Sequence, residues 1–138
     1  MLIDTPCIGI CSSVYGDAIC RGCKRTAKEV IDWNRFTTAE KLAIYQRLQA
    51  QIADVFLKYI DIVDANKLQE KITQHNIRLH PHVLDVEKAF HLLRLGANKI
   101  NQINAYGLQI KLEFSYLSLT ELFNKIDSEI YQKAITSK

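Results

Sequence analysis

The N-terminal part of the fold is decided by residues 7–33, CIGICSSVYGDAICRGCKRTAKEVIDW, which hold all four cysteines of the chain and run directly into a helix signal. The cysteines follow the spacing C-x3-C-x8-C-x2-C. Cysteines two or three residues apart can turn both sulfurs toward one centre, and the longer excursion lets the second pair complete a tetrahedral set of thiolates. We therefore predict a metal-binding knuckle with the ligands Cys7, Cys11, Cys20 and Cys23.

The spacing predicts one metal centre on these four cysteines but leaves its identity open. Zinc suits a closed shell of thiolates that holds together a small loop-rich segment without its own core. An iron–sulfur cluster uses the same ligands, and the isoleucine and valine side chains of the segment could shield it from water. A redox-active Cys20–Cys23 pair is a weaker alternative, because the segment lacks the βαβ context usual for that motif.

Basic residues crowd beside the second cysteine pair. Arg21, Lys24, Arg25 and Lys28 surround it, with only Glu29 opposing them. They could offset the negative charge of a thiolate centre, or form an ordinary solvated face. A nucleic-acid-binding module built on this patch beside a zinc knuckle is a further alternative.

Composition excludes several classes of protein. The chain has 138 residues, of which 48% are hydrophobic and 24% charged, so it is long enough to bury a core and is not of a disordered type. The formal net charge of +3 is too small to indicate nucleic-acid or membrane binding by itself. We find no secretory signal at the N-terminus and no apolar run near the roughly 18 residues that span a bilayer, so we expect a cytoplasmic protein without a membrane partner. Metal ligation fits a reducing cytosol better than two disulfides do.

Two capping-box patterns predict the helices that follow the knuckle. Thr26 with Glu29 opens a short helix that ends near Trp33, and Thr37 with Glu40 opens a longer one. The longer helix, residues 38–63, has apolar residues at alternating spacings of three and four, which form a narrow seam. This seam packs against the C-terminal half of the chain or, as an alternative, forms a homodimer contact. Its residues are Tyr45, Leu48, Ile52, Val55, Tyr59 and Ile62.

The C-terminal half mixes helical and strand signals. More helix follows residue 64, a connection is expected near residues 76–83, and a helix capped by Asp85 runs to Gly96. Alternating apolar residues predict a strand over residues 108–114, for which residues 100–106 could supply a hairpin partner. Ser118 with Glu121 opens a terminal helix. The fold class is therefore α+β and mostly helical, with a small β-hairpin.

These signals divide the chain into a four-cysteine metal-binding module, residues 1–51, and an α+β region, residues 52–138, that we expect to pack on the first. Trp33 is predicted to be a core residue that packs the short helix against the knuckle. His80, His82 and His91 could form a second metal site, although a surface turn is the stronger interpretation of this segment. We find no phosphate loop, nucleophile elbow, zinc-protease helix or dinucleotide fingerprint that would indicate an enzyme.

Residues 5–51 resemble a bacterial family of short four-cysteine proteins of unknown function, domain of unknown function 1289, whose members are commonly labelled iron–sulfur proteins. The resemblance implies metal binding by the four cysteines and no particular activity. Residues 52–138 resemble no family that we can name. The resemblance rests on Pro6, Cys7, Gly9, Cys11, Cys20, Gly22, Cys23, Arg25, Thr26, Glu29, Trp33, Glu40, Arg47 and Leu48.

These observations together predict a cytosolic metal-binding accessory or interaction protein with a protein partner. An electron-transfer or redox-sensing iron–sulfur protein is the first alternative, because it uses the same four ligands. A zinc-knuckle nucleic-acid-binding module is the second.

Overall fold

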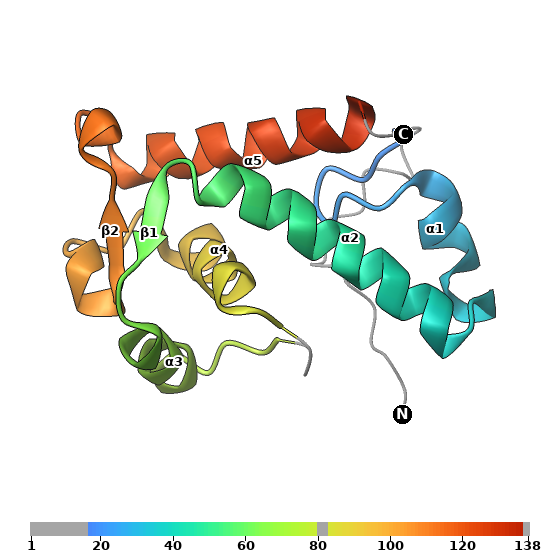
Figure 1. Ribbon diagram of the computed structural model, residues 1–138, viewed down its shortest axis with the longest axis horizontal. Helices are drawn as coiled ribbons and strands as arrows, with labels where there is room; N and C mark the ends of the chain where they lie inside the picture. The colour runs from blue at the N-terminus through green and yellow to red at the C-terminus, as the bar shows by residue number, and fades with distance from the viewer. Residues whose placement is uncertain (1–16, 80–82, 137–138) are drawn as a thin grey trace. The chain divides into compact units, whose positions relative to one another are not determined.

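The computed structural model describes residues 17–79 and 83–136 (Figure 1). The chain divides into two compact units. Unit 1 comprises Met1–Gln51 and Glu129–Lys138, and unit 2 comprises Ile52–Ser128. Two long helices, α2 and α5, contribute residues to both units.

Unit 1 contains a hairpin followed by helices. The hairpin leads into α1 (Ala27–Asp32), a 3-10 turn η2 (Trp33–Arg35) and the long helix α2 (Thr38–Phe56). Both predicted capping boxes are confirmed. In each box the threonine hydroxyl accepts from the backbone N–H of the glutamate, and the glutamate side chain accepts from the backbone N–H of the threonine. These bonds satisfy N–H groups that a helix start otherwise leaves without a partner.

A small aromatic core holds η2 against α2. Trp33 is buried among Ile44, Tyr45 and Leu48, and Phe36 and Leu42 pack around the cluster. The Trp33 ring meets the Tyr45 ring edge to face, with 5.8 Å between the centroids. The prediction that Trp33 is a core residue is confirmed.

Unit 2 is built around a two-stranded antiparallel sheet. Its strands are β1 (Ile60–Ile62) and β2 (Leu108–Ile110), and its helices are α3 (Ala65–Gln74), α4 (Asp85–Gly96) and the first part of α5 (Leu119–Thr136). Two 3-10 turns flank β2, η3 (Ile103–Tyr106) before it and η4 (Leu112–Phe114) after it. The fully buried side chains of unit 2 include Phe56, Ile60, Leu68, Leu93, Leu108, Leu122 and Ile126.

The prediction that residues 100–106 form the hairpin partner of β2 is wrong. Residues 103–106 form η3, and the strand pairs instead with β1, opposing Ile60 to Ile110 and Ile62 to Leu108. The strand is also shorter than predicted, because residues 112–114 form η4. Pairing between segments far apart in the chain depends on which apolar faces meet in the core, and local alternation does not carry that information.

The predicted helix over residues 38–63 also ends early. After Phe56 the backbone tightens into two i→i+3 bonds, from Lys58 N–H to Val55 C=O and from Tyr59 N–H to Phe56 C=O, before β1 begins. The β-branched run after Tyr59 favours a strand. Apolar residues before and after this turn happen to lie three or four positions apart. The apolar spacing in the sequence therefore continues past the end of the helix.

Five of the six seam residues are buried, and Ile62 is half-buried. Tyr45 and Leu48 are buried in unit 1, and Val55 and Tyr59 are buried in unit 2. Their burial agrees with packing inside each unit, and the homodimer contact stays a prediction.

The other local expectations for unit 2 are largely met. Helix α3 follows residue 64, as expected, and Ser118 accepts from the N–H of Glu121 at the start of α5. Asp64, which was not predicted to be a cap, caps α3 by accepting from two backbone N–H groups. Asp85 is the first helical residue of α4 and not its cap, because Leu84 holds that position. Gly96 is the last residue of α4, as predicted.

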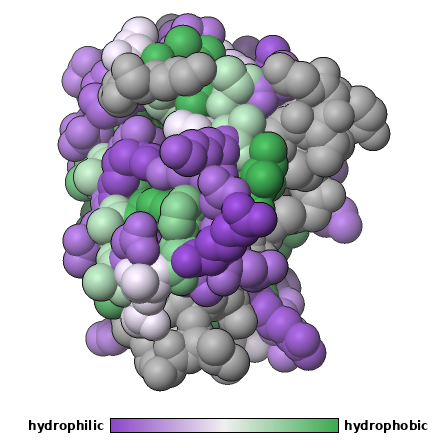
Figure 2. All heavy atoms as spheres, turned by 90° about the vertical axis from the view of Figure 1, so that its right-hand side faces the viewer, coloured by the Kyte–Doolittle hydropathy of each residue, from purple (hydrophilic) through white to green (hydrophobic). Residues whose placement is uncertain are grey.

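The α+β, mostly helical fold class is confirmed, with five α-helices and the small sheet within the described ranges. None of these helices, over residues 17–79 and 83–136, has the length and apolar character needed to cross a bilayer. Figure 2 shows the face at the right of Figure 1, where hydrophilic residues surround several smaller hydrophobic areas.

The turn before β2 gives a first prediction. Gly107 has a φ of 75°, and a Cβ atom there would lie 2.1 Å from the carbonyl oxygen of Asp64. Substitution G107A should lower the free energy of unfolding by about 1–3 kcal/mol, because it combines backbone strain with a clash against main chain. Urea unfolding followed by circular dichroism would measure this loss.

The matched control is G96A, since a Cβ atom at Gly96 meets only the side chain of Ile100, at 3.9 Å. This substitution in a helix should leave stability unchanged or raise it by up to about 1 kcal/mol. Equal losses in the two variants would contradict the role assigned to Gly107.

Candidate metal centre

Two of the four predicted ligands lie on a tight hairpin, residues 18–27. The N–H of Cys20 donates to the C=O of Arg25 at 2.8 Å, and the N–H of Lys24 donates back to the C=O of Cys20 at 2.8 Å. Lys24 takes a φ of 67°, a left-handed conformation uncommon for a residue with a side chain. The turn thus closes within six residues and places Cys20 and Cys23 on the same loop.

The other two predicted ligands, Cys7 and Cys11, lie outside the described residues. Cys20 is buried, with 1% of its surface exposed, and Cys23 is half-buried. No disulfide joins Cys20 to Cys23. Within residues 17–79 and 83–136, no group of three or more histidine, cysteine or acidic side chains is arranged to hold a metal ion. The donors that are described, two thiols of a C-x2-C loop, fit zinc or an iron–sulfur cluster by their chemistry.

The basic residues of the hairpin divide into buried and exposed ones. Lys24 and Arg25 are only 5% and 3% exposed, so the interpretation that they belong to a solvated face is wrong for these two residues. The Lys24 ammonium donates to the carbonyl groups of Arg21 and Gly22. Arg21 itself stays at the surface, where it lies 3.5 Å from Asp17 and over the ring of Tyr131.

Arg25 lies against the sulfur of Cys23. Its Nε donates to Cys23 Sγ at 3.2 Å, and its guanidinium lies 5.0 Å from the centroid of the Trp33 ring. Burial raises the pKa of the Cys23 thiol, and the hydrogen bond and positive charge of Arg25 lower it in part. The hairpin therefore brings a buried cation into direct contact with one of the predicted ligands.

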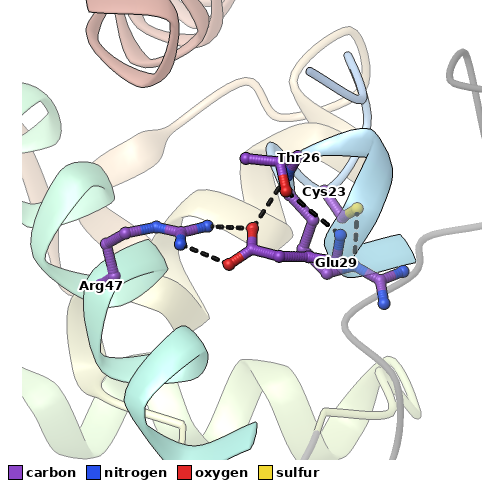
Figure 3. Close-up of polar contacts among 5 residues, drawn as sticks. Cys23, Thr26, Glu29 and Arg47 are labelled. Atoms are coloured by element: carbon purple, nitrogen blue, oxygen red, sulfur yellow. Dashed lines mark hydrogen bonds and ion pairs between the residues drawn. The ribbon is translucent and has the colours of Figure 1, made fainter. Parts of the chain in front are cut away.

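An ion pair connects the hairpin end of α1 to α2. Arg47 forms a bidentate pair with Glu29, with N–O distances of 2.5 and 2.6 Å, and Glu29 also closes the capping box with Thr26 (Figure 3). Burial acts to raise the pKa of Glu29, but the hydrogen bonds and charge of Arg47, together with Thr26, hold that pKa below its ordinary value. A single carboxylate thus connects the start of α1 to the middle of α2.

Sequence reasoning missed this pair. It identified Glu29 through its capping pattern, its place beside the basic residues and the family resemblance, and Arg47 only through the family resemblance. The two residues are 18 positions apart, and no periodicity links them. An opposite-charge contact at that separation becomes visible only when two helices are packed.

The histidine site proposed from the sequence is described in part. His80 and His82 lie outside the described residues. His91 lies on α4, where its Nδ1 accepts a hydrogen bond from Arg94 Nε at 3.1 Å. That contact lies within α4, between two residues one turn apart.

Comparison with protein families gives one match. Residues 5–52 match the model of a family described as "Protein of unknown function (DUF1289)". The matched segment covers the predicted cysteine ligands, the hairpin and the Glu29–Arg47 pair. No curated protein and no solved structure matches this chain. The resemblance to this family over the N-terminal segment is therefore confirmed, and it assigns no activity.

The Glu29–Arg47 pair gives a second prediction. A double-mutant cycle with E29Q and R47M should yield a coupling free energy of about 1–3 kcal/mol near neutral pH, because the pair is bidentate and Glu29 is only 14% exposed. Because the pKa of Glu29 is lowered in the folded protein, the coupling is fully present above its ordinary pKa. It is lost as the pH falls through the folded value. Thermal unfolding of the four proteins at several pH values would measure it.

The control cycle uses D85N and K88M, an exposed pair on α4 with 3.2 Å between the charged atoms. Its coupling should be about 0.5 kcal/mol or less. A Glu29–Arg47 coupling no larger than that of the control would contradict the role of this pair.

Proposed function

We propose that this protein is a cytosolic metal-binding accessory protein in which Cys7, Cys11, Cys20 and Cys23 hold one metal centre. The observation that carries the proposal is the hairpin at residues 18–27. There, backbone hydrogen bonds from Cys20 to Arg25 and from Lys24 to Cys20 hold Cys20 and Cys23 on one loop beside buried positive charge. A bound metal would supply a structural anchor for the N-terminal segment. No catalytic step is part of the proposal.

The burial of Arg25 supports an anionic sulfur centre. Removing a guanidinium from water costs several kcal/mol unless an opposite charge or a set of hydrogen bonds compensates. The described contacts of Arg25 are the Cys23 sulfur and the Trp33 ring, and no carboxylate is among them. Glu29, the nearest acidic residue in sequence, is engaged by Arg47 and Thr26. Thiolates gathered around a metal would place negative charge beside this guanidinium, whereas neutral thiols would not.

An iron–sulfur centre with an electron-transfer or sensing role is the second candidate. The burial of Cys20 and the hydrogen bond to the Cys23 sulfur favour it, since solvent exclusion and hydrogen bonds to sulfur set cluster potentials. The same two features also suit a structural zinc site. Metal analysis of the purified protein separates the two candidates.

We expect protein purified without oxygen to contain either about one zinc per chain and no visible colour, or iron with matching acid-labile sulfide and a brown colour. Variants C20S and C23S should each lose most of the metal, because three thiolates cannot complete the shell. Elemental analysis, sulfide assay and the visible spectrum would measure this.

The matched control is T26A, which removes the cap of α1 next to the hairpin but keeps all four thiols. It should lower stability by about 1 kcal/mol and retain the metal. A metal-free wild-type protein, or cysteine variants with wild-type metal content, would overturn the proposed function.

A further inference from the structure

The side chain of Arg25 lies between the predicted ligand Cys23 and the core residue Trp33 of unit 1. One end of its guanidinium donates to the Cys23 sulfur at 3.2 Å, and its plane lies 5.0 Å from the centroid of Trp33, the only tryptophan of the chain. With 3% of its surface exposed, the side chain is held in this place by its surroundings. Lys41 lies over the same indole, 5.6 Å from its centroid.

This arrangement gives Arg25 two chemical effects on the sulfur. An N–H group that points at a ligand sulfur fixes the direction of its lone pairs, which orients the ligand toward the metal. The positive charge also offsets the negative charge that thiolates bring together. The planar guanidinium is suited to this task, because it can donate through Nε while its face stays on an aromatic ring.

We propose that Arg25 is a positioning residue of the metal centre, which holds the Cys23 sulfur in its ligating orientation and connects it to Trp33. The inference rests on the proposed function, since it presupposes a metal on Cys23. Arg25, which is not itself a ligand, then determines how strongly the metal is bound. It also makes Trp33 a built-in optical reporter of the metal.

The structure offers a matched control in Arg47. Both arginines belong to the same unit and connect the start of α1 to its surroundings, but the charged contacts of Arg47 are to Glu29 and not to a sulfur. A variant at Arg47 therefore disturbs packing without touching a ligand. A difference between the two variants in a property of the sulfur–metal bond is specific to Arg25.

The experiment loads the full-length wild-type protein, R25M, R25K and R47M with Co(II). The charge-transfer band from thiolate to Co(II), the affinity by competition with a chelator, and the fluorescence of Trp33 are then measured. R25M should bind Co(II) about 10- to 100-fold more weakly, the usual effect of removing a group that orients a metal ligand. Its charge-transfer band should move to lower energy, because the sulfur lone pair loses a hydrogen bond, and its fluorescence should respond less to metal removal.

R47M should keep the wild-type band and affinity while its stability falls. R25K, which retains the positive charge, should lie between the wild type and R25M and provides the comparison should R25M fail to fold. Wild-type band and affinity in both Arg25 variants, or an equal band shift in R47M, would overturn the inference while leaving the proposed function intact. A wild-type protein that binds neither Co(II) nor its native metal would overturn both.

Discussion

The N-terminal unit depends on the burial of the Arg25 guanidinium between a sulfur and an indole. A buried cation is tolerated only where contacts with its surroundings offset the hydration free energy it has lost. The face of the indole offsets part of this loss through its quadrupole, and the sulfur offsets more of it when it is ionised. Metal ligation is the most direct way to keep a cysteine ionised in a buried site near neutral pH. One side chain thus joins the chemistry of the cysteines to the packing of the helices.

The contacts around Arg25 form a continuous path through unit 1. The chain turns from Cys23 through Arg25 into the capping box of α1, whose Glu29 reaches Arg47 on α2. Trp33 adds a second connection, because it receives Arg25 on its face and packs into the core beside α2. The hairpin is in this way connected to two helices by charge and aromatic contacts, in addition to the burial of Ile19 and Cys20.

The sequence predicted correctly the helix caps, which depend on residues close together in the chain. Thr26, Thr37 and Ser118 were identified as caps because a side chain three residues from a glutamate can satisfy free backbone donors whatever the rest of the chain does. The pairing of β1 with β2 and the end of α2 at Phe56 were not predicted. Both depend on which apolar surfaces meet, and the apolar spacing of residues 45–62 fits a longer helix equally well.

By itself, the sequence determined the mostly helical fold class, the starts of the capped helices and the burial of Trp33, because each follows from spacing within a few residues. The set of four cysteine ligands, also inferred from spacing, stays a prediction. Only the tertiary structure decided that Lys24 and Arg25 are buried, that Arg25 contacts the Cys23 sulfur, and that Glu29 pairs with Arg47. The physical reason is that burial and charge pairing are properties of packed surfaces. A run of basic residues in a sequence has the same appearance whether its charges face water or a sulfur, and the two outcomes differ only once the hairpin is folded against its helices.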